Sequence, residues 1–240
     1  MATAIEPQRP LTRGELATLI YQGWVHQGQR EAIASPHIIQ LQEPLALFTD
    51  VLNPAQPRHW AEAFIRGLVD LGLLNGFDDG TFRPEAPVAR VDYAGMLVAA
   101  FDPPPRSDRE QVDVSRLFRD VAAPPAAQFK VVDRIYRSGA MSGFDDGTFG
   151  VTRPISREQA ISALVNILNL EAGNPSSLNR YPDRATLSPW ATGAIAAATE
   201  AGLIVSAASP APDPIRAKEP ATRADVAALV YQGLRLLPAA

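Results

Sequence analysis

Hydrophobic positions recur with a helical period in residues 60–72. Phe64, Leu68 and Leu71 are spaced at i, i+4 and i+7, the spacing of an apolar stripe on an amphipathic helix. Gly72 stands where a residue in the left-handed conformation would end the helix. Residues 190–202 match this stretch, with Trp190 at the place of Trp60. The pattern therefore predicts two helices of the same kind far apart in the chain.

A second kind of helix start occurs four times, with an arginine in second place each time. The copies cover residues 12–23, 89–94, 156–161 and 222–233, and the first is a near-copy of the last. Successive arginines are 77, 67 and 66 residues apart. The near-equal steps of 67 and 66 residues indicate an internal repeat. The arginines are Arg13, Arg90, Arg157 and Arg223.

Three further markers keep the same register as the arginines. The sequence Gly-Phe-Asp-Asp-Gly-Thr-Phe begins at Gly76 and again at Gly143, and its Asp-Gly pair is a signal for a tight turn. Glycines that close a helix stand at 72, 139 and 202. An aromatic-x-Asp opening supplies the third marker, with aspartates Asp50, Asp120 and Asp183.

These markers divide the chain into three full repeats and a half. We call residues 48–102 the first unit, 118–170 the second and 181–237 the third, which is degenerate because a loop rich in Ser, Ala and Pro replaces its glycine-rich turn. Residues 1–47 hold the half repeat and a connector. One unit is too small to bury a core, so we expect residues 1–240 to form one mainly α domain of tandem helix-turn-helix repeats with short β-turn or hairpin segments. The period alone fits an open array or a closed pseudo-threefold bundle.

Three of the four arginine helix starts carry the side chains of a capping box. The hydroxyl accepts from the third backbone N–H, and the acid or amide reaches back to the cap. Ala89 lacks the hydroxyl. The predicted boxes are Thr12-x-x-Glu15, Ser156-x-x-Gln159 and Thr222-x-x-Asp225.

An arginine at the first helical position faces the positive end of the helix dipole, which costs about 0.3–1 kcal/mol. Four such choices suggest that each arginine meets an anion. One interpretation is an internal ion pair with an aspartate such as Asp50, Asp120 or Asp183. The other is an external anion held by the guanidinium and free backbone N–H groups. Both hold at once if the aspartate aims the arginine at a groove.

Composition removes several classes of function. A net charge of −4 gives no basic face for nucleic acid. The chain has no cysteine and three histidines, which argues against a metal site, and Asp78-Asp79 offers too few oxygens for calcium, so we read it as a turn. No apolar run approaches the ~18 residues of a transmembrane helix. No catalytic set has a recognisable local context, and we expect neither enzyme activity nor a cofactor.

Taken together, the aromatic-x-Asp opening, the Trp60 helix, the glycine-rich turn and the Thr-Arg-x-Glu helix start resemble S-layer homology repeats. The resemblance runs from about Phe48 to Leu237. It implies a pseudo-threefold assembly of three repeats around a central helical bundle. It also implies non-covalent binding of an anionic, often pyruvylated, cell-wall polysaccharide or peptidoglycan-linked polymer in grooves between repeats.

The resemblance also assigns residues to the expected grooves. The arginines at 90, 157 and 223 would meet the acid group, with Arg13 as a fourth candidate; the missing turn of the third unit favours Arg90 and Arg157 over Arg223. Trp60 and Trp190 would stack on sugar rings, or else anchor the core. The second unit has Ala127 in place of this tryptophan. The remaining candidate positions are Asp50, Asp120 and Asp183, for hydroxyls or for the arginines, and Gly76 and Gly143.

The leading hypothesis is therefore a non-catalytic attachment module that docks on an anionic envelope polysaccharide. The alternative is an intracellular protein–protein scaffold that uses the same fold to dock in a larger complex. The first residues lack a basic segment followed by an apolar one, so they do not read as a signal peptide. We expect the cell envelope if an upstream signal was removed, and the cytoplasm if Met1 is the true start.

Overall fold

The computed structural model describes residues 48–51, 59–109, 112–122, 126–205 and 213–237, all within one compact unit, Leu47–Ala240. Across these residues the fold is mainly helical, as predicted. The β-pairing in this part of the chain consists of isolated bridges. None of the described helices is long and apolar enough to cross a membrane. The α-helices are α3 (Glu62–Asp70), α4 (Arg90–Phe101), α5 (Val114–Leu117), α6 (Ala127–Arg137), α7 (Arg157–Ile167), α8 (Pro189–Glu200) and α9 (Arg223–Leu236), and the 3₁₀ helices are Ser107–Arg109, Pro175–Arg180 and Arg184–Thr186.

Each described unit contributes one outer helix, α3, α6 or α8. The predicted left-handed glycine follows each of them, with φ of +69° at Gly72, +79° at Gly139 and +68° at Gly202. The predicted stripe of α3 was wrong at Leu71, which is 59% exposed. The helix ends at Asp70, so the helical period no longer applies to Leu71. The buried stripe runs instead through Ala61, Ile65 and Leu68.

Each unit also contributes one arginine helix, α4, α7 or α9. The two capping boxes predicted within the described residues are confirmed: Ser156 and Gln159 cap α7, and Thr222 and Asp225 cap α9. Ala89 precedes α4 without a side-chain cap. The box predicted at residues 12–15, like Arg13, lies outside the described residues.

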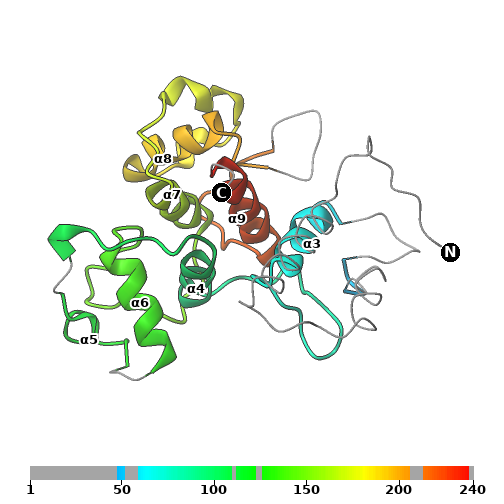
Figure 1. Cartoon of the computed structure of the whole chain (residues 1–240). Helices are drawn as coiled ribbons and strands as arrows, with labels where there is room; N and C mark the ends of the chain where they lie inside the picture. Colours follow the sequence, from blue (N-terminus) through cyan, green and yellow to red (C-terminus); the bar gives the residue numbers. More distant parts are fainter. Residues whose placement is uncertain (1–47, 52–58, 110–111, 123–125, 206–212, 238–240) are drawn as a thin grey trace, which may run out of the picture. The chain divides into compact units, whose positions relative to one another are not determined.

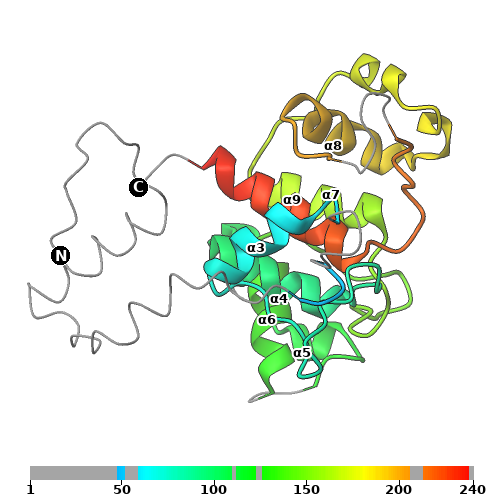
Figure 2. The same ribbon diagram turned by 90° about the vertical axis from the view of Figure 1, so that its right-hand side faces the viewer.

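The three arginine helices contact one another, and each carries the outer helix of the unit that follows. Helix α6 packs on α4 and α8 packs on α7, while α3, from the first unit, packs on α9 of the third. Figure 1 shows α4, α7 and α9 between the three outer helices, and Figure 2 shows α3 beside α9 from a second side. The packing is therefore cyclic, because the last unit holds the outer helix of the first.

Three backbone hydrogen bonds at the helix starts link all three units. Val88 N–H donates to the carbonyl of Ala221 (3.0 Å), Ala221 N–H to Ile155 (2.8 Å), and Ile155 N–H to Val88 (2.9 Å). All three residues are buried. Because each unit gives one bond to a neighbour and receives one from the other, the bonds form a closed ring, which we call the backbone ring.

Candidate functional site

Each aspartate of the aromatic-x-Asp opening accepts hydrogen bonds from backbone N–H groups in the loop that precedes the arginine helix of its own unit. Asp50 accepts from Phe82 (2.8 Å) and Arg83 (2.7 Å). Asp183 accepts from Ile215 (2.9 Å) and Arg216 (2.8 Å). We call this arrangement the aspartate clip. It is present in the third unit even though that unit lacks the glycine-rich turn.

The clip of the second unit makes one bond more. Asp120 accepts from Phe149 (2.7 Å), Gly150 (2.8 Å) and Val151 (2.9 Å). Burial raises the pKa of Asp120, but the three N–H donors outweigh it and the pKa falls below its ordinary value. Gly150 has φ of +76°, and its counterparts Arg83 and Arg216 have φ of +58° and +55°. The clip therefore fixes a left-handed residue at one place in every unit, and this conformation is strained at Arg83 and Arg216 but not at the glycine.

The arginines of the three helix starts reach into the clipped loop of the next unit. Their Nε groups donate to the backbone carbonyls of loop residues that the clip also holds. We call these side chains the inter-unit arginines. The bonds are Arg90 to Phe149 (2.9 Å), Arg157 to Ile215 (2.7 Å) and Arg223 to Phe82 (2.8 Å).

Arg90 is 5% exposed, and all three of its guanidinium nitrogens are occupied. Besides its Nε bond, Nη2 donates to the carbonyl of Ser142 (2.8 Å) and Nη1 to Oε1 of Gln159 (3.3 Å). Burial, and then the charge of Arg153, lower the pKa of Arg90 to about 10, so it stays charged at neutral pH. Its contacts are those of a structural side chain.

Arg157 is 6% exposed and forms an ion pair with Asp225, which is itself buried. Burial raises the pKa of Asp225, but the charge of Arg157 and the bonds from Thr222 lower it by more. The net pKa lies below its ordinary value, so the carboxylate stays ionised. Asp225 therefore both caps α9 and neutralises Arg157 at the start of α7.

Arg223 is the partly exposed member of the three. Its Nη2 donates to the carbonyl of Asn75 (2.8 Å), and its guanidinium carbon lies 4.3 Å from the ring centroid of Phe82. No described residue accepts a hydrogen bond from its Nη1. The structure thus leaves a donor of Arg223 available to a ligand.

A groove of about 180 Å³ opens beside Arg223, between α9 and the loop and helix of the first unit. Asp92, from the first turn of α4, lies on its wall, and the attraction of this carboxylate opposes the lowering of the Arg223 pKa by burial. The lining residues are Leu74, Phe77, Ala86, Pro87, Val88, Asp92, Met96, Arg223 and Val226. We call this the Arg223 groove.

A smaller groove of about 120 Å³ borders Arg157 and the third unit. Its polar lining includes Arg180, Thr199 and Asp213 beside the ring of Tyr181. Arg157 thus touches an open space at one edge while its Nε and Nη1 are bound on the other side.

The two tryptophans lie in different surroundings. Trp60 is half-buried and meets Phe64 edge-on, with ring centroids 6.3 Å apart. Trp190, in the first turn of α8, is 60% exposed. Neither lines the grooves at Arg223 and Arg157. Ala127, which replaces the tryptophan in the second unit, is exposed at the start of α6.

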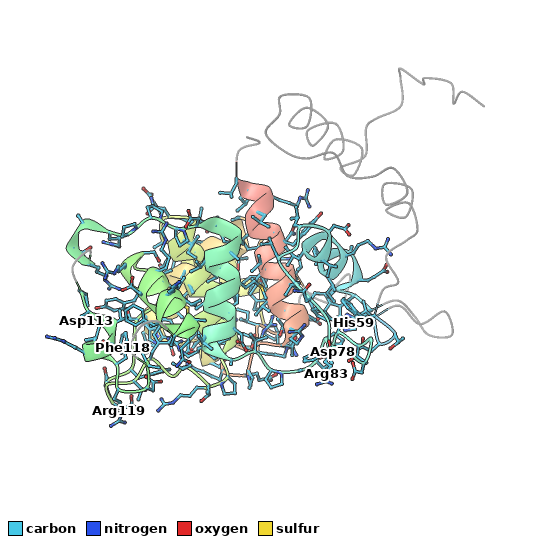
Figure 3. The ribbon with its side chains drawn as sticks, turned by 60° about the horizontal axis from the view of Figure 1, so that its bottom comes forward. His59, Asp78, Arg83, Asp113, Phe118 and Arg119 are labelled. Carbon is cyan, nitrogen blue, oxygen red and sulfur yellow. The ribbon has the colours of Figure 1, made fainter. Side chains whose placement is uncertain are left out.

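The glycines at the start of the turn lie against the aromatic ring that precedes the clip. A Cβ on Gly76 would come within 2.0 Å of the ring of Phe48, and one on Gly143 within 2.1 Å of the ring of Phe118. Figure 3 shows the end of the fold that bears these loops, with Phe118 and Arg119 in the second unit and Asp78 and Arg83 in the first.

The second aspartate of each glycine-rich turn braces the turn itself. Asp79 accepts from the hydroxyl of Thr81 (2.6 Å) and from Arg83 (2.9 Å), and these bonds lower its pKa to about 2. Asp146 does the same with Thr148 and Arg153. Within the described residues, no group of three His, Cys, Asp or Glu side chains is placed to hold a metal ion.

The sequence reasoning missed the side chain that links each inter-unit arginine to the next arginine helix. It is the third residue of that helix: Gln159 accepts a hydrogen bond from Arg90, Asp225 forms an ion pair with Arg157, and Asp92 attracts Arg223 by its charge across the groove that both line. The register of the repeat contained this signal, because these residues stand two places after each arginine. Asp50, Asp120 and Asp183, the candidate partners, accept hydrogen bonds from backbone N–H groups, and the charges of Asp120 and Asp50 also act to raise the pKa of Arg90 and Arg223 respectively.

Comparison with known proteins gives matches of one kind. The family model of the S-layer homology domain matches residues 56–94 and 117–161. The Surface-layer 125 kDa protein of Lysinibacillus sphaericus is 24% identical over 70% of this chain and 13% of its own length. Two proteins of Acetivibrio thermocellus also match: Cell surface glycoprotein 1, 28% identical over 80% of this chain and 8% of its own, and the Cellulosome-anchoring protein, 26% identical over 48% and 25%. The chain spans a quarter or less of each relative.

Proposed function

Because this chain belongs to the S-layer homology domain family, we propose that it is a non-catalytic module that attaches a protein to the cell envelope. Its ligand is an anionic cell-wall polysaccharide, and the acid group of one sugar unit binds in the Arg223 groove. The names of the relatives, which refer to a surface layer, a cell surface and anchoring, support the attachment role.

The single observation that carries the assignment of the groove is the unoccupied donor of Arg223. A charge-assisted hydrogen bond to a carboxylate contributes about 1.5–3 kcal/mol. Arg90 offers no comparable donor, because its three nitrogens already bind protein acceptors. This reverses the order that we expected from the sequence, in which Arg90 was preferred to Arg223.

The remaining walls of the Arg223 groove fit a sugar that bears an acid. The carboxylate of Asp92 accepts from hydroxyl or amide groups, and Phe77, 39% exposed, offers an apolar face. The volume of about 180 Å³ is below the ~300–1,000 Å³ of pockets for drug-sized ligands. One acid-bearing sugar unit, rather than a longer segment of polymer, fills such a groove.

The test is retention on purified cell-wall sacculi. Arg223→Gln removes the charge but keeps a polar side chain, and we expect at least a tenfold loss of affinity, since 1.4 kcal/mol corresponds to a factor of ten. Arg235→Gln removes a charge from the exposed end of the same helix and should leave retention unchanged. Equal retention of both variants, with intact helical circular dichroism, would reject the groove assignment.

The scaffold alternative predicts a different result in the same assay. Sacculi from which the anionic polymers have been extracted should lose the protein if a polysaccharide is the ligand. Undiminished retention on the extracted sacculi would instead indicate a protein or peptidoglycan partner, as the scaffold hypothesis requires.

A further inference from the structure

Three consecutive residues near the C-terminal end of α9 make specific contacts with the elements around it. Tyr231 meets Phe64 of α3 edge-on at 5.7 Å and covers Gly67, where a Cβ would come within 2.2 Å of the Tyr231 ring. Gln232 Nε2 donates to the carbonyl of Gly202 (3.3 Å). Gly233 is buried, and a Cβ there would come within 3.0 Å of Leu164 and 3.1 Å of Phe101.

These three residues distinguish α9 from the other arginine helices. The equivalent residues are Val98-Ala99-Ala100 in α4 and Val165-Asn166-Ile167 in α7. The mark of the α9 position in the bundle is therefore an aromatic ring and, two residues later, a glycine. The ring covers a glycine of the outer helix, and the second glycine leaves room for neighbouring side chains.

Residues 12–23 carry this mark. They are identical to residues 222–233 at seven of twelve positions, and Tyr21, Gln22 and Gly23 stand where α9 has Tyr231, Gln232 and Gly233. Thr12 and Arg13 match the cap and the inter-unit arginine of α9. The copy thus has the residue types with which α9 makes its contacts at both ends, and its sequence matches α9 rather than α4 or α7.

Among the described residues, the three places for an arginine helix in the bundle are already filled by α4, α7 and α9. The ring of three arginine helices is closed, and the backbone carbonyls that accept an inter-unit arginine are occupied at Phe82, Phe149 and Ile215. The copy also has larger residues at buried places of α9, such as Leu16 for Val226 and Ile20 for Val230. Extra volume in a packed core is unfavourable, so the copy is a weaker occupant than α9 itself.

We propose that residues 12–23 of one chain replace α9 in the bundle of a second copy of this chain, so that copies link by exchange of an equivalent helix. The surface that receives the copy is formed by α3, α4 and α7, which α9 covers in the single chain. Arg13 then donates to the carbonyl of Phe82 and Tyr21 covers Gly67 of the second copy. Such exchange is rare while α9 is intact, since α9 is tethered to its own bundle.

The test weakens α9 in the full-length chain and asks which segment replaces it. Tyr231→Ala should convert part of a concentrated sample to dimers or larger species in size-exclusion chromatography with light scattering. Adding Tyr21→Ala to the same chain should restore the monomer. If Tyr231→Ala caused association only by exposing apolar surface, the double variant would associate as much or more, and that result would overturn the proposal. A Tyr231→Ala variant that stays monomeric at every concentration would overturn it as well.

A labelled peptide of residues 10–27 gives a second readout that does not depend on association. It should bind the full-length Tyr231→Ala/Tyr21→Ala chain more tightly than the unchanged chain, and the same peptide with Arg13→Gln and Tyr21→Ala should bind at least tenfold more weakly. Equal binding of the two peptides would contradict recognition through the α9 contacts.

Discussion

The inter-unit arginines stand at equivalent places in the three units but differ in what surrounds their guanidinium groups. All three donate through Nε to a clipped loop, but their surroundings differ. Arg90 and Arg157 are buried, whereas Arg223 is partly exposed beside a groove. The cation that opposes the helix dipole is in each case stabilised by carbonyl oxygens of the neighbouring unit.

Arg90→Gln should destabilise the fold rather than remove a ligand contact. The shorter side chain leaves the buried carbonyl of Phe149 without its donor, at a cost of about 1–3 kcal/mol, and it also removes the bond to the carbonyl of Ser142, which water can replace. In urea unfolding, Arg90→Gln should have a lower free energy of unfolding than Arg223→Gln. The reason is that water reaches the partly exposed site of Arg223 and can replace the lost hydrogen bonds there. Similar losses in both variants would contradict this division of roles.

Asp120 gives a prediction about pH. Its pKa is lowered in the folded state, so its stabilisation is present above the unfolded pKa of about 3.9 and is lost as the pH falls through the folded pKa. Asp120→Asn should lose about 2 kcal/mol of unfolding free energy at pH 7. The difference in unfolding free energy between the two proteins should narrow as the pH falls below the unfolded pKa, as urea titrations at successive pH values can measure. A constant gap would mean that the carboxylate charge is irrelevant.

At the scale of the helix, local signals decide where the elements begin and end. The capping boxes of α7 and α9 and the left-handed glycines after α3, α6 and α8 are all as predicted from the sequence. Such signals act within a few residues, which is why they could be read without the structure. Helix α4 is the exception, since Ala89 supplies no cap.

Ala89→Ser should add the missing cap and raise the free energy of unfolding by about 1 kcal/mol. The backbone of Ala89 is already extended, with φ of −70° and ψ of 148°, and Asp92 stands where Asp225 completes the box of α9. The matched control is Ser156→Ala, which should lower the stability of the chain by a similar amount. If the denaturant midpoints of both variants were higher than that of the unchanged protein, or both lower, the capping argument would be refuted.

At the scale of the whole chain, the period of the repeat predicted the units but left their closure open. Closure depends on backbone groups, such as the N–H of Val88 and the carbonyl of Ala221, which carry no sequence signature. The same limit applies to the site. The positions of the arginines were predicted, but their Nε groups bind backbone carbonyls, and the burial and the Nη1 partner that distinguish Arg90 from Arg223 depend on the packing of other units.

Attachment through the Arg223 groove is the central claim, and the most direct measurement is calorimetric titration of the protein with a purified anionic wall polysaccharide before and after its acid groups are chemically removed. The account predicts that removing the acid groups weakens binding at least tenfold, and that Arg223→Gln, unlike the unchanged protein, binds both polymers equally. Equal affinity of the unchanged protein for the acidic and the neutralised polymer would contradict the account.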